Sequence, residues 1–157
     1  MMKAVLASGY YDPIHTGHIE YLEEAKSYAS RMGAHLVVIV NNDKQAALKK
    51  GKPFMCEDER LKIVQSLRCV DHAFIAPDRD ASVCESIREA ARHYKIIAFA
   101  KGGDRFSNEI PEAAVCRDLA ITIIDGLGLK IQSSSALIAA AGDTNAPTPL
   151  PVKGTST

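Results

Sequence analysis

The chain alternates between short apolar runs rich in β-branched residues and longer segments with helical spacing. The apolar runs lie at residues 3–8, 35–41, 72–76, 96–100 and 121–125. After the first run, Ile19, Leu22, Ala25 and Ala29 recur at steps of three and four residues, and Gly33 then ends the pattern. Strands that alternate with helices require right-handed crossovers, so this order predicts a mostly parallel sheet with helices on both faces.

We therefore predict an α/β fold, a single Rossmann-like doubly wound domain with a five-stranded parallel sheet. The chain has 157 residues, which suits one domain. We place this domain at 1–141, with further helices around 61–67, 81–94, 109–119 and 135–141. The segment 142–157 is rich in Pro, Thr and Gly and is predicted to be a disordered tail. Such sheets bind ligands beyond the carboxyl ends of their strands, so the loops after the first, second and fourth strands should carry the chemistry.

The charge balance excludes some classes of partner. Nineteen basic and nineteen acidic side chains cancel, which argues against a general nucleic-acid binder. No apolar run approaches membrane-spanning length, and the first apolar run is typical of a buried strand and not of an export signal. We expect a cytoplasmic protein with no nucleic-acid or membrane partner. Its four cysteines lack a Cys-x-x-Cys pair and are predicted to be reduced, mostly buried thiols.

The segment 9–18, here called the histidine loop, follows the first strand and reads Gly-Tyr-Tyr-Asp-Pro-Ile-His-Thr-Gly-His. It leads into a predicted helix, whose N-terminus attracts phosphate through unpaired N–H groups and the helix dipole. His15 and His18 are three residues apart and lie on one side of the chain if that turn is helical. Their imidazoles can then donate hydrogen bonds to phosphate oxygens. A metal pair is the alternative, but no third ligand lies nearby in the sequence, so no metal site is predicted.

Basic side chains follow the second predicted strand and flank the helix after it. Lys44, Lys49, Lys50 and Lys52 are expected on a mobile loop around Gly51 that closes over a triphosphate. The alternative is a solvated basic surface. Further along, Arg60 and Arg68 lie about 80° apart around the next helix, so both need not serve one ligand. For Arg60, a structural ion pair is the alternative to a ligand contact.

Two later segments can also bind a nucleotide. Residues 101–105, Lys-Gly-Gly-Asp-Arg, follow the fourth strand, and the paired glycines permit close approach of the backbone to a ligand. A tight turn is the alternative there. Ser133, Ser134 and Ser135 precede the last predicted helix. Serine is a preferred N-cap, and the hydroxyl and N–H groups of this run can also hold a β- or γ-phosphate.

Together these segments resemble the cytidylyltransferase-like nucleotidyltransferases over residues 3–141. That family has a Gly-x-Phe-Asp-x-x-His-x-Gly-His string, which this chain carries at 9–18 with Tyr11 in the Phe place. It also has a basic loop, an Arg before a Val-Asp pair (here Arg68 and 70–71), a Gly-Asp turn and a Ser-Thr-Thr-like helix start. Nearest in pattern are heptose-1-phosphate adenylyltransferase and glycerol-3-phosphate cytidylyltransferase.

The resemblance implies transfer of an NMP unit from an NTP to a phosphorylated small molecule such as a sugar phosphate, with release of pyrophosphate. It also implies Mg²⁺ bound mainly through the NTP phosphates, and a homodimer. ATP is favoured over CTP, because the neutral run 126–128 stands where the cytidylyl branch has an Arg. The alternatives are a glycerol-3-phosphate-type cytidylyltransferase, an adenylyl-transferring cousin acting on phosphopantetheine or nicotinamide mononucleotide, and a non-catalytic nucleotide-binding regulator.

The resemblance also implies roles for single residues. His15 and His18 would stabilise the α-phosphate, Lys49 or Lys52 would hold the triphosphate, and Asp12 would position the substrate or its Mg²⁺ complex. The catalytic set is then His15, His18, Lys49 and Lys52. The nucleotide-binding set is Gly9, Tyr10, Tyr11, Asp12, Gly17, Arg68, Lys101, Gly103, Asp104, Ser133, Ser134 and Ser135.

Overall fold

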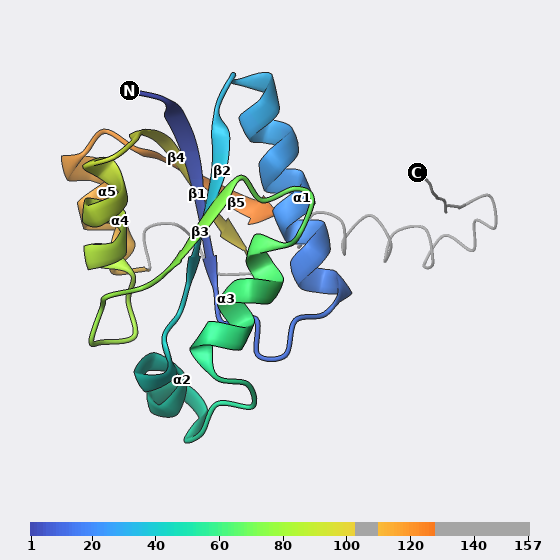
Figure 1. Ribbon diagram of the computed structural model, residues 1–157. Helices are drawn as coiled ribbons and strands as arrows, with labels where there is room; N and C mark the ends of the chain where they lie inside the picture. Colours follow the sequence, from blue (N-terminus) through green and yellow to red (C-terminus); the bar gives the residue numbers. More distant parts are fainter. Residues whose placement is uncertain (103–109, 128–157) are drawn as a thin grey trace, which may run out of the picture.

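The fold is a five-stranded, all-parallel sheet between two layers of helices (Figure 1). The computed structural model describes residues 1–102 and 110–127. The strands are β1 (Lys3–Gly9), β2 (His35–Val40), β3 (His72–Ile75), β4 (Lys95–Gly102) and β5 (Thr122–Leu127), and their order across the sheet is β3-β2-β1-β4-β5. This confirms the predicted fold class. The predicted helix 135–141, the tail, and Gly103, Asp104, Ser133, Ser134 and Ser135 lie outside the described residues.

Helices α1 (Thr16–Arg31) and α3 (Glu57–Gln65) cover one face of the sheet, and α4 (Cys84–Ala91) and α5 (Glu112–Asp118) cover the other (Figure 1). Successive side chains of a strand point to opposite faces, and β1 shows this directly. Val5 and Ala7 pack in the cluster under α1, whereas Ala4 and Leu6 pack in the cluster under α4 and α5. Burial on both faces explains why the strands read as continuous apolar runs.

The order of the strands places a topological switch beside β1. The chain runs from β1 outward to β2 and β3, and then crosses back to β4 on the other side of β1. Ligands of doubly wound sheets bind at such a switch, outside the carboxyl ends of the strands. The histidine loop leaves the end of β1 and therefore lies at this position.

The lysine-rich segment after β2 is a helix, and the prediction of a mobile loop there was wrong. Helix α2 (Asp43–Lys50) begins with a capping box, in which the Asn42 side chain accepts from Gln45 N and the Gln45 side chain accepts from Asn42 N. The helix ends at Gly51, whose φ of +85° lies in the region that favours glycine. Gly51 thus terminates α2, and only Lys52 of the four lysines lies beyond it.

The cysteines are less buried than predicted. All four are free thiols; Cys116 is buried, Cys69 and Cys84 are half-buried, and Cys56 is exposed. The prediction of mostly buried thiols was therefore wrong in extent. In the described part of the chain, no helix has the length and apolar character needed to cross a membrane.

Candidate nucleotide-binding site

Two histidines cap the start of α1 and hold each other in place. His15 is the N-cap residue, and its Nδ1 accepts a hydrogen bond from Gly17 N at 3.1 Å. In return, His18 Nδ1 accepts from His15 N, also at 3.1 Å. The ring centroids lie 3.9 Å apart with 30° between the planes. The His-x-Gly-His spacing is therefore the spacing of a capping box, with imidazoles in place of the usual Ser and Glu.

This capping fixes which nitrogen of each imidazole carries the proton. In a neutral ring one nitrogen is a donor and the other an acceptor. Because Nδ1 of both rings accepts a backbone N–H, the proton of each neutral ring resides on Nε2. Each ring thus presents an Nε2–H donor at a helix N-terminus, where the backbone N–H groups and the helix dipole favour anions. The arrangement is chemically suited to phosphate.

The glycines of the histidine loop leave room for aromatic rings. A Cβ on Gly17 would lie 3.0 Å from His15 Cε1, and one on Gly9 would lie 2.7 Å from Tyr11 Cζ. The Tyr11 side chain is 1% exposed and packs in the core, with its ring centroid 5.1 Å from that of His18. Burial strongly raises the pKa of Tyr11, so its hydroxyl stays protonated. Tyr11 supports His18 from the core side of the loop.

Asp12 ties the histidine loop to the connection between α2 and α3, residues 51–56. Its Oδ2 accepts from Phe54 N at 2.8 Å, and its Oδ1 accepts from Met55 N at 2.6 Å. The residue is 6% exposed. Both carboxylate oxygens therefore hold backbone amides, and Asp12 anchors the α2–α3 connection to the site.

Arg60 is a structural residue, which resolves the alternatives left open by the sequence. Its side chain is completely buried, and its ion pair with Asp43 spans 2.7 Å from Nη2 to Oδ1. Nη1 donates to the carbonyls of Tyr10 at 2.8 Å and Asn41 at 2.6 Å, and Nε donates to the carbonyl of Met55 at 2.9 Å. A buried charge needs such partners. One guanidinium thus joins the ends of β1 and β2, the start of α2 and the α2–α3 connection.

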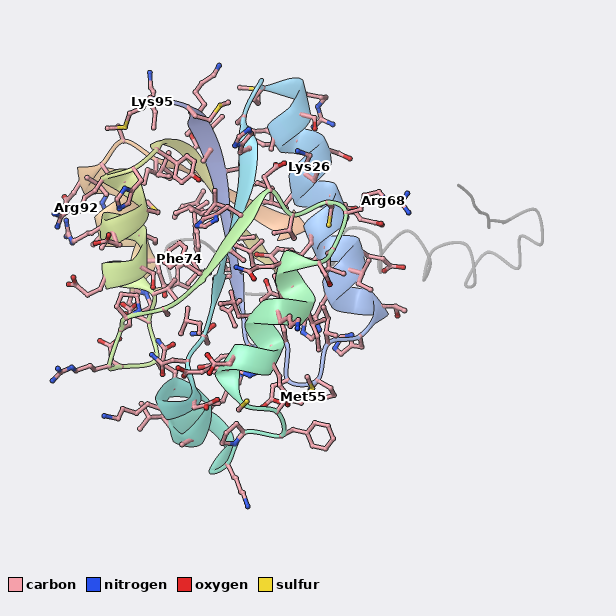
Figure 2. The ribbon with its side chains drawn as sticks, in the orientation of Figure 1. Lys26, Met55, Arg68, Phe74, Arg92 and Lys95 are labelled. Carbon is pink, nitrogen blue, oxygen red and sulfur yellow. The ribbon has the colours of Figure 1, made fainter. Side chains whose placement is uncertain are left out.

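The remaining basic residues of the prediction are spread over the molecule. Lys49 and Lys52 are exposed near the carboxyl end of β2, and Lys49 Nζ lies 4.6 Å from the centroid of the Tyr10 ring. Lys101 is buried near the end of β4. Arg68 is exposed on the connection from α3 to β3, and Figure 2 shows it at the other end of α3 from Met55. Within this chain, Arg68 therefore lies away from the residues that Asp12 and Arg60 bring together.

A polar network that the sequence analysis missed holds the loop after β3. Asn42 Nδ2 donates to the carbonyls of Ala76 and Asp78, and Gln45 Nε2 donates to those of Asp80 and Ser82. These amides bring the β3–α4 loop to the carboxyl edge of the sheet. The Asn-x-x-Gln pattern of a capping box was the available sequence signal.

The donor set of the site suits a metal that arrives with the nucleotide. Across residues 1–102 and 110–127, no group of three or more His, Cys, Asp or Glu side chains is arranged to hold a metal ion. Mg²⁺ keeps several waters and commonly binds through substrate phosphates with one or two carboxylates. The residues present are therefore compatible with Mg²⁺ bound mainly to a triphosphate.

The all-parallel sheet, the switch point beside β1 and the helices on both faces define a doubly wound α/β protein. A sequence model of the cytidylyltransferase-like family matches residues 6–144, and the chain belongs to that family. It is accordingly a nucleotidyltransferase, as the resemblance of its motifs predicted.

Two curated proteins and one solved structure show which members of the family this chain is similar to. The chain is 35% identical over 139 residues to the FAD synthase of Methanocorpusculum labreanum, a match that covers 87% of this chain and 94% of that protein. It is 43% identical over 79 residues to the FAD synthase of Ferroglobus placidus, which covers 50% of this chain and 49% of that one. Among solved structures, the lipopolysaccharide core biosynthesis protein of Thermoplasma volcanium is 26% identical, with a TM-score of 0.60. That match covers 80% of this chain and 96% of the Thermoplasma protein.

Proposed function

We propose that this chain is an adenylyltransferase that moves AMP from ATP to the phosphate of a small molecule, and that the acceptor is FMN. The observation that carries the proposal is the pair of Nε2–H donors that the capping of α1 presents at the switch point. The choice of ATP and FMN is supported by the identity of 35% to a protein named FAD synthase, of which the match covers 94%.

The proposed step is an in-line displacement at phosphorus. An oxygen of the acceptor phosphate attacks the α-phosphorus of ATP and forms a new P–O bond. The bond from the α-phosphorus to the oxygen that bridges to the β-phosphate breaks, and pyrophosphate leaves with the electron pair. With FMN as acceptor, the product is FAD, joined through the new P–O–P anhydride. The acceptor phosphate is anionic at neutral pH, so the step needs no protein nucleophile, and catalysis rests on positioning and electrostatics.

The residues divide this work by position. We assign the Nε2–H groups of His15 and His18 to the non-bridging oxygens of the α-phosphate, where negative charge accumulates in the transition state. Lys49 and Lys52 provide point charges for the triphosphate. Mg²⁺, when bound to the triphosphate, would offset the charge of the phosphates. Lys101, Gly103 and Asp104 are proposed to contact the nucleoside, and Ser133, Ser134 and Ser135 the β- and γ-phosphates.

A sugar phosphate is the second candidate acceptor. The solved structure at 26% identity and 96% coverage is titled a lipopolysaccharide core biosynthesis protein, a role that involves sugars. The two candidates share the reaction and differ in the group that carries the phosphate, so product analysis separates them.

The test is pyrophosphate release in the presence of Mg²⁺, with ATP and CTP each crossed against FMN, heptose phosphates, glycerol 3-phosphate, phosphopantetheine and nicotinamide mononucleotide. The expected result is release with ATP and FMN together, FAD as the chromatographic product, and loss of both in His18→Ala. Turnover with a sugar phosphate and not with FMN would contradict the acceptor, and turnover with CTP alone would contradict the nucleotide. ATP binding without product from any pair of substrates would favour the alternative function, a non-catalytic nucleotide-binding regulator.

A further inference from the structure

An aromatic ring of the histidine loop lies against one of the exposed lysines. We propose that Tyr10 is a positioning residue that holds the Lys49 ammonium over the histidine loop, so that Lys49, and not Lys52, is the lysine that meets the incoming triphosphate. The inference rests on the proposed function in taking ATP as the triphosphate. It also selects Lys49 from the two lysines that the sequence left as alternatives for holding the triphosphate.

The backbone that carries the Tyr10 ring is held in place. Tyr10 directly follows the end of β1, and its carbonyl accepts from Arg60 Nη1 at 2.8 Å. The Arg60 side chain is completely buried, so the donor has little freedom to move. The Tyr10 side chain itself is half-buried, which leaves part of the ring accessible. A cation that contacts this ring is thereby placed relative to the loop that enters α1.

Lys49 is tied to the same anchor through its helix. It lies in the last turn of α2, and Asp43 at the start of α2 forms an ion pair with Arg60 at 2.7 Å. One buried guanidinium therefore holds both the backbone that carries the Tyr10 ring and the helix that carries the lysine. Lys49 Nζ lies 4.6 Å from the ring centroid, within the 6 Å over which the ring quadrupole attracts a cation.

Lys52 differs from Lys49 in both respects. It follows Gly51 and therefore lies outside α2. Within residues 1–102 and 110–127, the cation–π contacts pair Lys49 with Tyr10 and Arg31 with Tyr28. The ring contact near the proposed site thus singles out Lys49.

Such placement helps ATP binding by reducing the ordering that binding requires. A lysine side chain has many rotamers, and fixing them on binding weakens the affinity. The Tyr10 ring already restricts the Lys49 ammonium to the neighbourhood of the histidine loop. A cation–π contact at an exposed site corresponds to a factor of about 2–5 in an equilibrium constant, and the Lys49 ammonium is expected to keep this contact while it faces the triphosphate.

The experiment is calorimetric titration of the full chain with Mg·ATP in the absence of any acceptor. We expect Tyr10→Leu to raise Kd by about 2–5-fold, and Tyr10→Phe, which keeps the ring, to bind more tightly than Tyr10→Leu. Lys49→Met should weaken binding more than Lys52→Met. In the Lys49→Met background, Tyr10→Leu should have no further effect. Tyr28→Leu is the matched control, because it removes the ring beside Arg31 at the far end of α1 and should leave Kd unchanged.

Equal effects of Tyr10→Leu in the unmodified and Lys49→Met backgrounds would overturn the inference, because the ring would then act without the lysine. A larger loss in Lys52→Met than in Lys49→Met would also overturn it. Absence of Mg·ATP binding by the unmodified chain would overturn both the inference and the proposed nucleotide. If Mg·ATP binds with the expected pattern but FMN is not converted to FAD, only the proposed acceptor fails.

Discussion

At the scale of single residues, the imidazoles of the histidine loop cap a helix and, in the proposed function, also donate to phosphate. Each ring accepts a backbone N–H through Nδ1, which caps α1, and each presents a proton on Nε2. The helix cap and the proposed phosphate donor are thus the two different nitrogens of the same ring. Under the proposed function, we expect substitutions at these positions to change helix capping and catalysis together, unless the new side chain keeps one task and loses the other.

The first prediction separates these tasks. His18→Ala removes one preorganised donor and is expected to lower kcat by about 10²–10³. His15→Asn also removes an imidazole, but Asn is a preferred N-cap and can still accept from the first turn of α1. We expect His15→Asn to lower kcat while the thermal midpoint stays near that of the unmodified chain. Steady-state kinetics and calorimetric melting check both variants, and normal turnover in a folded His18→Ala protein would remove His18 from the mechanism.

A second residue-scale prediction concerns Tyr11, whose hydroxyl is buried without a hydrogen-bond partner among the described residues. A buried, unsatisfied polar group costs about 1–3 kcal/mol. Tyr11→Phe removes that group and keeps the ring against Gly9 and His18. The free energy of unfolding in urea should therefore rise by about 1 kcal/mol. Tyr11→Leu is the control, since it lacks the ring and should destabilise the fold; a loss of stability in Tyr11→Phe would show that the hydroxyl has a partner.

At the scale of elements, polar contacts between loops hold the carboxyl edge of the sheet together. Asp12 binds two amides of the α2–α3 connection, Arg60 joins that connection to β1, β2 and α2, and Asn42 with Gln45 holds the loop after β3. Helix α2 depends on such contacts, because it has little apolar packing of its own. Among its residues with described side chains, only Gln45 and Ala46 are buried. The site is therefore assembled by hydrogen bonds around a sheet that apolar packing has built.

The opposite edge of the sheet has its own polar link, and it makes stability depend on pH. Asp71 Oδ2 accepts from Lys26 Nζ of α1 at 2.6 Å and from Leu36 N of β2 at 2.7 Å. Burial acts to raise the pKa of the Asp71 carboxyl, but the bonds from Lys26 and Leu36 outweigh it and hold the pKa below the ordinary value of 3.8. A depressed pKa contributes stability above pH 3.8, and this contribution is lost as the pH falls through the folded-state value.

Asp71→Asn removes the charge and should therefore cost about 1 kcal/mol of unfolding free energy at pH 7. The difference between Asp71→Asn and the unmodified chain should be constant from pH 7 to pH 5 and should shrink below pH 3.8. Urea unfolding across this range measures it. Lys26→Met is the matched control, because it removes the other partner of the ion pair and should give a similar loss at pH 7. A difference that stays constant down to pH 3 would contradict the assigned pKa shift.

At the scale of the whole molecule, the layers of the fold could be predicted from the sequence, whereas the candidate site could be predicted only in part. The strands are buried on both faces, so each reads as an apolar run, and 3–8 and 72–76 match β1 and β3 closely. Helix α2 was missed because periodicity detects apolar faces and not caps. The histidine loop was found because its residues are adjacent in the chain. The contacts of Asp12 with Met55 and of Arg60 with Tyr10 span 43 and 50 residues, and no local pattern carries them.

The buried thiol of Cys116 can report whether α4 and α5 stay packed on the sheet. Cys116 lies in the apolar cluster on that face and is 1% exposed. Burial, with Glu112 and Cys84 nearby, raises the pKa of this thiol from 9.0 to about 11. At pH 8 the native thiol is therefore both covered and protonated, whereas the thiolate is the reactive form.

With Ellman's reagent at pH 8, exposed Cys56 should react first, and Cys116 should react only as fast as its face of the sheet opens. In sub-denaturing urea, the logarithm of the Cys116 labelling rate should rise in proportion to the fall in unfolding free energy, because apolar packing on this face must be broken to expose the thiol. Cys56→Ser is the control, since it removes the fastest phase and should leave the labelling rate of Cys116 unchanged. Rapid labelling of Cys116 in the native protein, identified by peptide mapping, would mean that α4 and α5 separate from the sheet without global unfolding. The two helix layers would then be independent in stability, although one sheet connects them.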